Sequence, residues 1–224
     1  QLAKAVCFYS PWQYIYWYDY PTNSPGYNVN AGNQMITDVP EMEFWDYMPA
    51  VWDETRVLQG SIGQYAIIAR RTGTQWFIGA MNANSTRTFN VPLNFLTPDR
   101  KYIANVYSQD PSVPTRTHVR IDRLVVDSTA TLTMILDASR GEAVRLIPAN
   151  PPAIQSISPL NNDGGFSLTV AGNIGLPYSL WSSPDLTLPN NNWTLLNSGL
   201  ITTNPFRWND SHNQAQRFYR CSTP

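Results

Sequence analysis

Residues 51–82 have the sequence VWDETRVLQGSIGQYAIIARRTGTQWFIGAMN, and this stretch determines the predicted fold class. Apolar and polar side chains alternate along it with a period of two, which is typical of β-strands. Turn residues interrupt the alternation at Gly60-Ser61 and at Thr72-Gly73. The stretch therefore predicts three consecutive strands, at Trp52–Leu58, Gln64–Arg70 and Gln75–Met81.

The same pattern continues as far as residue 148. Five more segments are expected to be strands: Thr86–Asn94, Lys101–Ser108, Thr117–Leu124, Ala130–Leu136 and Ala143–Ile147. Glycine, proline, asparagine and aspartate separate these segments at short, regular intervals. Eight short strands of this kind predict a mainly β protein with an antiparallel, eight-stranded β-sandwich over residues 51–148.

Residues 1–50 have a different pattern, which predicts a short α-helical segment before the sandwich. Apolar side chains follow helical spacing at Leu2, Ala5, Val6 and Tyr9. Ser10-Pro11 provides an N-cap and a first-turn proline, so a second helix or turn is expected to begin there. Residues 21–34 are irregular, and a short helix is expected at Glu41–Tyr47.

The composition changes after Pro148. A proline-rich linker is expected at residues 149–153, and only six of the 15 basic and 16 acidic residues follow Pro148. Residues 154–224 are predicted to form a second, small β-sandwich. Its strand candidates are Ile154–Ser158, Phe166–Ala171, Tyr178–Ser182, Trp193–Asn197, Phe206-Arg207 and Arg217–Cys221.

Composition excludes several classes of function. The net charge of −1 is unsuited to a nucleic-acid partner or a polybasic membrane anchor, and no apolar run reaches the 18 residues that a membrane helix needs. With only two histidines and two cysteines, a His-rich metal site or a serine-protease triad is not expected, and we predict no metal site. The cysteines, Cys7 and Cys221, lie near opposite ends, and their pairing stays open. The chain has no initiator Met and no signal peptide, so a mature product or a fragment is expected.

Carboxylates are densest between residues 38 and 54, where aromatic side chains alternate with them. A sugar hydrolase needs two carboxyl groups, one acid and one base or nucleophile, so the candidate catalytic residues are Asp53, Glu54 and Glu41, with Trp45 and Trp52 as candidate substrate-binding residues. The other acidic members are Asp38, Glu43 and Asp46. The alternative is an exposed acidic helix followed by a strand, in which Asp53 and Glu54 form ion pairs with Arg56, Arg70 or Arg71. The residues favour this alternative, because neighbours in a strand point to opposite faces.

Aromatic clusters offer a second kind of carbohydrate site, because aromatic faces complement the apolar faces of sugar rings. One cluster is the run of eight aromatic residues from Phe8 to Tyr20; another is Trp181, Trp193 and Trp208 in the small sandwich. The alternative interpretation for both is core packing, or for the first a docking face. Residues 161–164 (NNDG) could bind calcium, but a tight turn is the better interpretation.

Five blocks of sequence, taken in order, resemble the C-terminal part of glycoside hydrolase family 97, bacterial α-glucosidases and α-galactosidases. The blocks are residues 1–6 (QLAKAV), 10–13 (SPWQ), 51–60 (VWDETRVLQG), 63–71 (GQYAIIARR) and 75–82 (QWFIGAMN), with Val39-Pro40 before the third. Residues 153–224 resemble a small secreted bacterial accessory module, through residues 178–186 (YSLWSSPDL), 192–194 (NWT) and 217–220 (RFYR).

The family resemblance implies that residues 1–50 are the end of a (β/α)8 barrel and that residues 51–148 are a C-terminal sandwich for packing or oligomerisation. It also implies that the catalytic glutamates and the calcium ligands of the full-length family lie upstream of Gln1, so no cofactor is expected in this chain. Tyr20–Asn33 departs from the family pattern. The accessory module implies export, to the periplasm or the cell exterior.

Three hypotheses follow. The first is a carbohydrate-associated C-terminal part of an exported family 97-like hydrolase, serving packing, oligomerisation or glycan binding. The second is an autonomous glycosidase that uses carboxylates of the 38–54 region, and the third is a noncatalytic carbohydrate-binding or assembly module. The expected partners are carbohydrate and either a second copy or a missing barrel domain, with no nucleic acid and no membrane.

Overall fold

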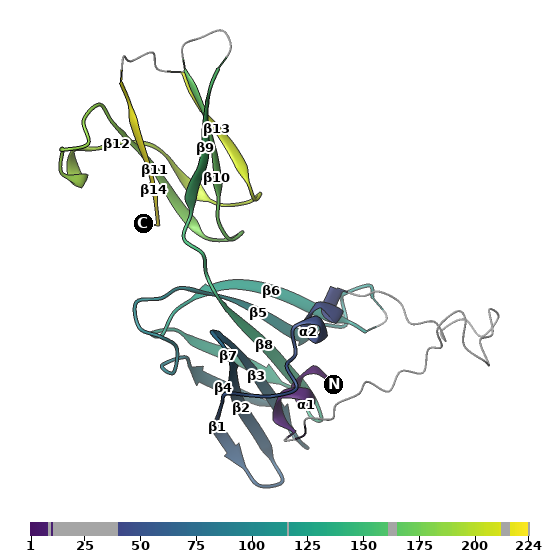
Figure 1. Cartoon of the computed structure of the whole chain (residues 1–224). Helices are drawn as coiled ribbons and strands as arrows, with labels where there is room; N and C mark the ends of the chain where they lie inside the picture. Colours follow the sequence, from purple (N-terminus) through teal and green to yellow (C-terminus); the bar gives the residue numbers. More distant parts are fainter. Residues whose placement is uncertain (9, 11–39, 116, 161–164, 212–215, 224) are drawn as a thin grey trace. The chain divides into compact units, whose positions relative to one another are not determined.

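The computed structural model describes residues 1–8, 10, 40–115, 117–160, 165–211 and 216–223 (Figure 1). It divides into two compact units, one of residues 1–99 and 104–147 and the other of residues 100–103 and 148–224. Most of the aromatic run, the second helix expected at Ser10-Pro11, the loop at 21–34, Asp38 and the turn at 161–164 lie outside the described residues. No helix in the described part of the chain is long and apolar enough to cross a membrane.

The first unit is built on two antiparallel sheets, which confirms the predicted mainly β fold class. Six strands form one sheet in the order β1-β2-β3-β8-β5-β6, and β4 pairs with β7 in the other. Their bounds are β1 Glu54–Ser61, β2 Tyr65–Thr72, β3 Gln75–Asn82, β4 Arg87–Pro92, β5 Tyr102–Gln109, β6 Val119–Val126, β7 Thr131–Leu136 and β8 Gly141–Pro148. The three strands of the opening stretch pair in sequence, from Glu54 opposite Arg71 to Thr72 opposite Gln75.

Strand β3 is covered on both faces, which explains its nearly continuous apolar sequence. The Trp76 ring lies tilted against Phe95, beyond the end of β4, with the ring centroids 4.7 Å apart. Phe77, on the opposite face, meets Phe44 edge-on with the centroids 5.5 Å apart. Successive strand residues point to opposite faces, so Trp76 and Phe77 pack on opposite sides of the sheet. In contrast, β7 alternates strictly between exposed and buried residues, because only one of its faces is covered.

The helical part of residues 1–50 is shorter than its pattern predicts. Helix α1 (Leu2–Cys7) ends where Phe8 becomes extended, and the helix expected at Glu41–Tyr47 is a 3₁₀ turn, η2 (Pro40–Met42), followed by α2 (Glu43–Asp46). Helix α1 packs directly on β3 at Gly79, where a Cβ atom would lie 2.6 Å from the carbonyl oxygen of Ala3. Glycine is therefore required there for the helix to approach the sheet.

The second unit contains two three-stranded sheets, in the orders β13-β10-β9 and β12-β11-β14. The strands are β9 Ala153–Pro159, β10 Phe166–Ala171, β11 Pro177–Ser183, β12 Thr194–Leu200, β13 Phe206–Asp210 and β14 Phe218–Ser222, with a 3₁₀ turn, η3, at Asn190–Asn192. Buried Leu168 and Val170 of β10 and Leu180 of β11 form its core. The central strand of each sheet thus supplies the apolar side chains, as the period-two pattern predicts.

Candidate functional site

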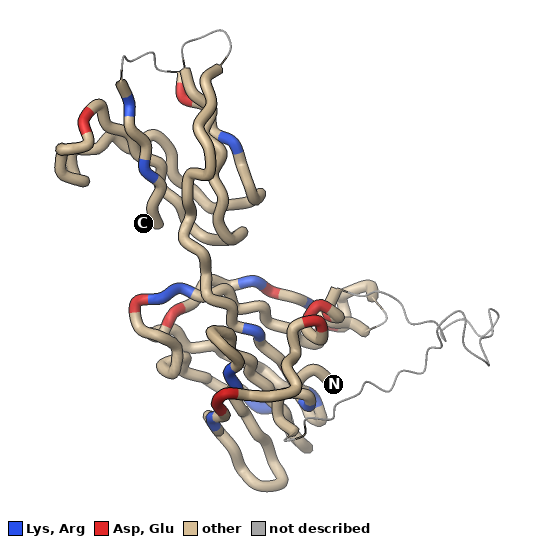
Figure 2. Tube along the Cα trace, viewed as in Figure 1, with Lys and Arg blue, Asp and Glu red and all other residues tan. Residues whose placement is uncertain are grey.

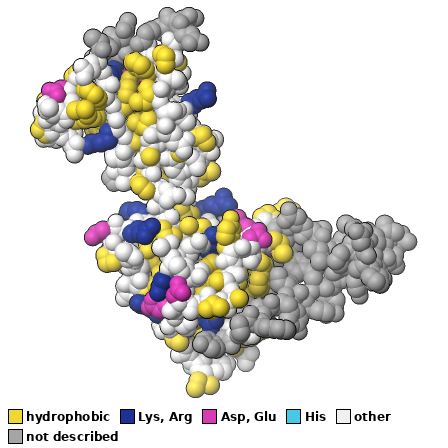
Figure 3. All heavy atoms as spheres, viewed as in Figure 1, with side chains coloured by type: hydrophobic (Ala, Val, Ile, Leu, Met, Phe, Trp, Pro, Cys, Tyr) yellow, Lys and Arg dark blue, Asp and Glu magenta, His cyan; other side chains and the backbone are white. Residues whose placement is uncertain are grey.

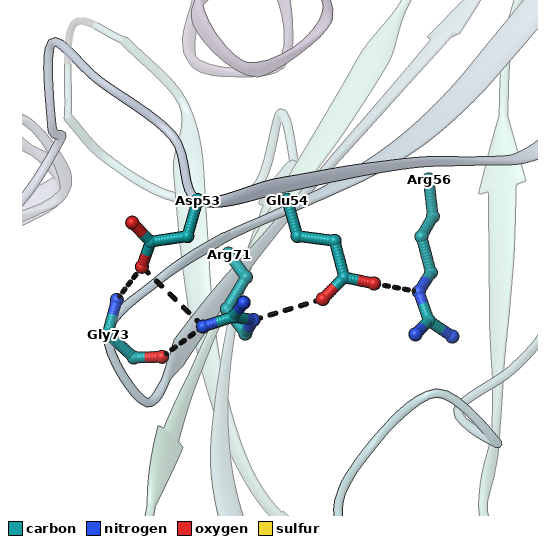
Figure 4. A network of polar contacts seen from close by, with 5 residues as sticks. All are labelled: Asp53, Glu54, Arg56, Arg71 and Gly73. Carbon is teal, nitrogen blue, oxygen red and sulfur yellow. Dashed lines mark hydrogen bonds and ion pairs between the residues drawn. The ribbon is translucent and has the colours of Figure 1, made fainter.

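Asp53 and Glu54 lie at the start of β1, in a network with two arginines and the turn between β2 and β3 (Figure 4). Glu54 accepts hydrogen bonds from Arg56 Nε at 2.6 Å and from Arg71 Nε at 3.1 Å. Asp53 accepts one from the Gly73 N–H at 2.7 Å and lies 3.5 Å from Arg71 Nη1. Both carboxylates thus tie the start of β1 to the neighbouring hairpin.

The two arginines of this network favour the ionised state of Glu54. The hydrogen bonds from Arg56 and then Arg71 lower the pKa of the half-buried Glu54 carboxyl below its ordinary value. A general acid needs a raised pKa, and a nucleophile must face a substrate cleft. Neither Asp53 nor Glu54 lines a described pocket, so the geometry gives them a structural role in the ion-pair network.

The two candidate tryptophans of this region lie in different places. Trp52 packs against Phe77 with ring centroids 5.4 Å apart, and the Arg70 guanidinium lies 5.7 Å from its ring. Trp45, on α2, meets Phe44 edge-on at 6.4 Å and also lines a cavity. The structure therefore does not bring Trp45 and Trp52 together with Asp53 and Glu54 in one site.

The cavity beside Trp45 has a volume of about 680 Å³ and lies between α1, the η2–α2 segment and the ends of β3, β5 and β8. Glu41 lines it, is only 5% exposed, and has no hydrogen-bond partner for either carboxylate oxygen among the residues that the structure describes. Neighbouring Glu43 is satisfied, since it accepts a 2.8 Å hydrogen bond from the Tyr107 hydroxyl and lies 3.7 Å from Arg123. Of the three candidate carboxylates, Glu41 alone lines a described pocket.

The first comparison with known proteins concerns the strands of this unit. Residues 51–147, which span all eight of its strands but for the last residue of β8, match the family described as "Glycosyl-hydrolase 97 C-terminal, oligomerisation". Residues 51–147 are a family 97 C-terminal domain. The resemblance inferred from the blocks in this region is thereby confirmed.

The chain that contains this family 97 C-terminal domain is similar to two named bacterial proteins. The chain is 33% identical over 107 residues to a retaining alpha-galactosidase of Bacteroides thetaiotaomicron, covering 48% of this chain and 14% of that protein. It is 46% identical over 50 residues to a probable retaining alpha-galactosidase of Streptomyces bingchenggensis, covering 22% of this chain and 8% of that protein. The chain thus spans a small fraction of the relatives that it matches.

Solved structures show the same partial coverage. A family 97 enzyme in complex with panose, from a Pseudoalteromonas species, is 25% identical over 48% of this chain and 18% of its own, with a TM-score of 0.44. A beta-arabinopyranosidase is 26% identical over 50% of this chain and 18% of its own, with a TM-score of 0.41.

The family 97 C-terminal domain shows no metal centre in its described residues. No group of three or more His, Cys, Asp or Glu side chains that could hold a metal ion occurs in the part of the chain that the structure describes. Cys7 and Cys221 are both free thiols, and burial raises the pKa of each to about 11, so neither is activated as a nucleophile.

Beyond the family 97 C-terminal domain, two tryptophans of the small sandwich, Trp181 and Trp193, contact one arginine. The Arg220 guanidinium lies 5.8 Å from the Trp181 ring and 5.2 Å from the Trp193 ring. The indole N–H groups donate to Ser222 Oγ and to the Leu188 carbonyl, each at 3.2 Å. The structure thus brings Trp181 and Trp193 together, but through a cation–π contact within the chain.

A buried ion pair in the small sandwich was not predicted from the sequence. Arg217 Nε lies 3.0 Å from Asp210 Oδ2, with side-chain exposures of 6% and 1%, and the Tyr219 hydroxyl donates to the same oxygen at 3.0 Å. Figure 2 shows how few charges this unit carries. The available signal was that the few charged residues after Pro148 include both signs. A charge retained in a small core is usually paired with an opposite charge.

Proposed function

We propose that this chain is a noncatalytic C-terminal part of an exported bacterial family 97 glycoside hydrolase, and that residues 51–147 mediate its self-association. The proposal rests on one observation, the match of nearly the whole first sandwich to a domain described as an oligomerisation domain. The ion pairs of Asp53 and Glu54 support the noncatalytic part, because both carboxylates already have partners within the fold. The named relatives are α-galactosidases, so the substrate class of the whole protein would be α-galactosides.

The purified chain is expected to be at least dimeric by light scattering, and to release no p-nitrophenol from p-nitrophenyl α-galactoside or α-glucoside. Asp53→Asn and Glu54→Gln are the matched variants for the second measurement, and neither is expected to change the baseline. A strictly monomeric chain at all concentrations would contradict self-association. Hydrolysis that either variant abolishes would instead favour the autonomous glycosidase.

A second role, as a docking face for another domain, is favoured by the cavity at Glu41. A buried carboxylate without hydrogen bonds is costly, and both oxygens of Glu41 have this status. A partner surface with N–H or O–H donors, inserted beside Trp45 and Leu2, would remove that penalty. We propose that the hydrolase domain of the longer protein is this partner.

Replacing Glu41 with methionine is expected to raise the free energy of unfolding of the isolated chain by roughly 1–3 kcal/mol, because it removes an unsatisfied buried group. Glu43→Met is the control: it is expected to destabilise by about 1 kcal/mol, since it breaks the hydrogen bond from Tyr107. Urea unfolding of the three proteins measures both changes. A loss of stability in Glu41→Met would mean that the carboxylate already has a favourable role in this chain.

A further inference from the structure

The β1–β2 hairpin ends in an apolar projection beside an apolar groove. Ile62, in the turn, is fully exposed, and Val57 on β1 is 72% exposed. Figure 3 shows hydrophobic atoms at the tip of this hairpin, at the bottom of the view. Between the hairpin and the end of β3 lies a groove of about 580 Å³, whose lining includes Val57, Ile62, Tyr65 and Met81.

None of the described residues that line this groove carries a charge, although charged residues make up 14% of the chain. The ion pairs of Glu54 with Arg56 and Arg71 lie at the opposite end of the hairpin, at the start of β1. In a two-fold symmetric dimer a patch meets an identical patch, so any charge in it would face a like charge. The Arg87 guanidinium borders the lining, but it already donates to Gln64 Oε1 at 3.1 Å and to Asn82 Oδ1 at 2.7 Å. A lining without charged side chains is therefore suited to a second copy of the same chain.

The projection and the groove belong to one patch, so a two-fold axis can bring the projection of one copy to the groove of the other. When two copies meet about a two-fold axis, the Ile62 side chain of each copy can enter the groove of the other and approach Val57 there. Strand β1 is also an edge of the six-stranded sheet. However, its register shifts between Val57 and Gln59, and such a bulge discourages a continuous sheet across two molecules. Side-chain packing is thus the favoured contact.

We propose that the tip of the β1–β2 hairpin is the self-association surface of this chain, with Ile62 of each copy seated in the groove beside Val57 of the other. The inference rests on the proposed function, because it locates the contact through which residues 51–147 would oligomerise. Its occupant is a second copy of this chain.

Ile62→Asp is expected to weaken self-association by about tenfold or more, as is typical for the loss of a central apolar contact. The measurement is sedimentation velocity over a range of protein concentrations. Ile135→Asp is the matched control, since Ile135 is a 67% exposed isoleucine of the same unit, on β7 and outside the groove. It is expected to associate as the unchanged chain does. Circular dichroism and urea unfolding confirm that both variants fold.

A pair of variants tests the reciprocal contact directly. Ile62→Asp and Val57→Lys are each expected to be monomeric alone, because each places a charge in an apolar contact on both sides of the axis. Mixed together they are expected to form a one-to-one dimer, in which one contact joins the new Asp to the new Lys and the other stays unchanged. A mixture that remains monomeric would contradict the proposed pairing.

The outcomes separate the two proposals. If the unchanged chain is monomeric, the proposed self-association itself fails. If it oligomerises and Ile62→Asp and Val57→Lys oligomerise equally well, the proposed function stands and the hairpin surface is wrong. The same conclusion follows if Ile135→Asp dissociates the oligomer as strongly as Ile62→Asp does.

Discussion

Replacing Asp210 with alanine is expected to lower the free energy of unfolding of the small sandwich by about 3–5 kcal/mol, the usual effect of removing one partner of a buried ion pair. The Asp210 side chain is 1% exposed and Arg217 6%. Without the carboxylate, the buried Arg217 guanidinium loses this counter-charge, and the Tyr219 hydroxyl loses its acceptor. A unit of this size has few kcal/mol of stability in total, so partial unfolding at room temperature is expected.

Hydrogen exchange read by mass spectrometry locates this effect. Protection is expected to fall in β9–β14 and to persist in β1–β4, β6 and β7, because these two sets of strands lie in separate compact units. Asp185→Ala is the control: Asp185 is an exposed carboxylate of the same unit that accepts hydrogen bonds from Thr187, and a much smaller effect is expected. Asp210→Ala combined with Arg217→Met should recover part of the loss, since no buried charge then remains. Equal losses in Asp210→Ala and Asp185→Ala would show that the buried pair contributes little.

Stability of the first unit is expected to fall as the pH rises from about 4.5 to about 7, because of Glu142. This side chain, on β8, is 8% exposed. Burial raises its pKa from the ordinary 4.5 to about 7, which the charge of Arg120 partly opposes. In this window the folded chain holds a proton that the unfolded chain has released, so raising the pH favours unfolding. The full shift corresponds to about 3 kcal/mol.

Glu142→Gln should abolish this dependence, since glutamine does not ionise. The measurement is the difference in free energy of unfolding between Glu142→Gln and the unchanged chain, from urea titrations at pH 4 to 8. The variant is expected to gain relative stability progressively across the window and to level off above it. Carboxyls with a lowered pKa, such as Glu54 and Asp110, lose stability at lower pH in both proteins, so they cancel in the difference. A difference that does not change with pH would contradict the assigned ionisation.

The strands were predictable because their signal is local. The segment Ala130–Leu136 alternates with a period of two, and β7 accordingly runs from Thr131 to Leu136 with every second side chain buried. Helix lengths were less predictable: the helical spacing extends to Tyr9, but α1 ends at Cys7, where Phe8 turns extended. Spacing shows which side chains could share a helix face, whereas the end of the helix depends on what the following residues contact.

The candidate site was predictable only in part. A partner for Asp53 and Glu54 among nearby arginines was one of the two interpretations, and the antiparallel register places Arg71 directly opposite Glu54. The contact of Arg220 with both Trp181 and Trp193 was not foreseen, because it joins three strands or turns that are distant in sequence. The burial of the Glu41 carboxylate could not be predicted from the sequence either, since an acidic stretch of this kind indicates an exposed helix.

The sequence by itself determined the fold class, the strands and the family of residues 51–147, because period-two alternation and motif order are properties of the chain read in one dimension. Only the tertiary structure decided which charged groups are buried, such as Glu142, Asp210 and Glu41, and which large apolar groups are exposed, such as Ile62. The physical reason is solvation: whether a side chain keeps its water depends on the strands that fold over it, and those come from distant parts of the chain.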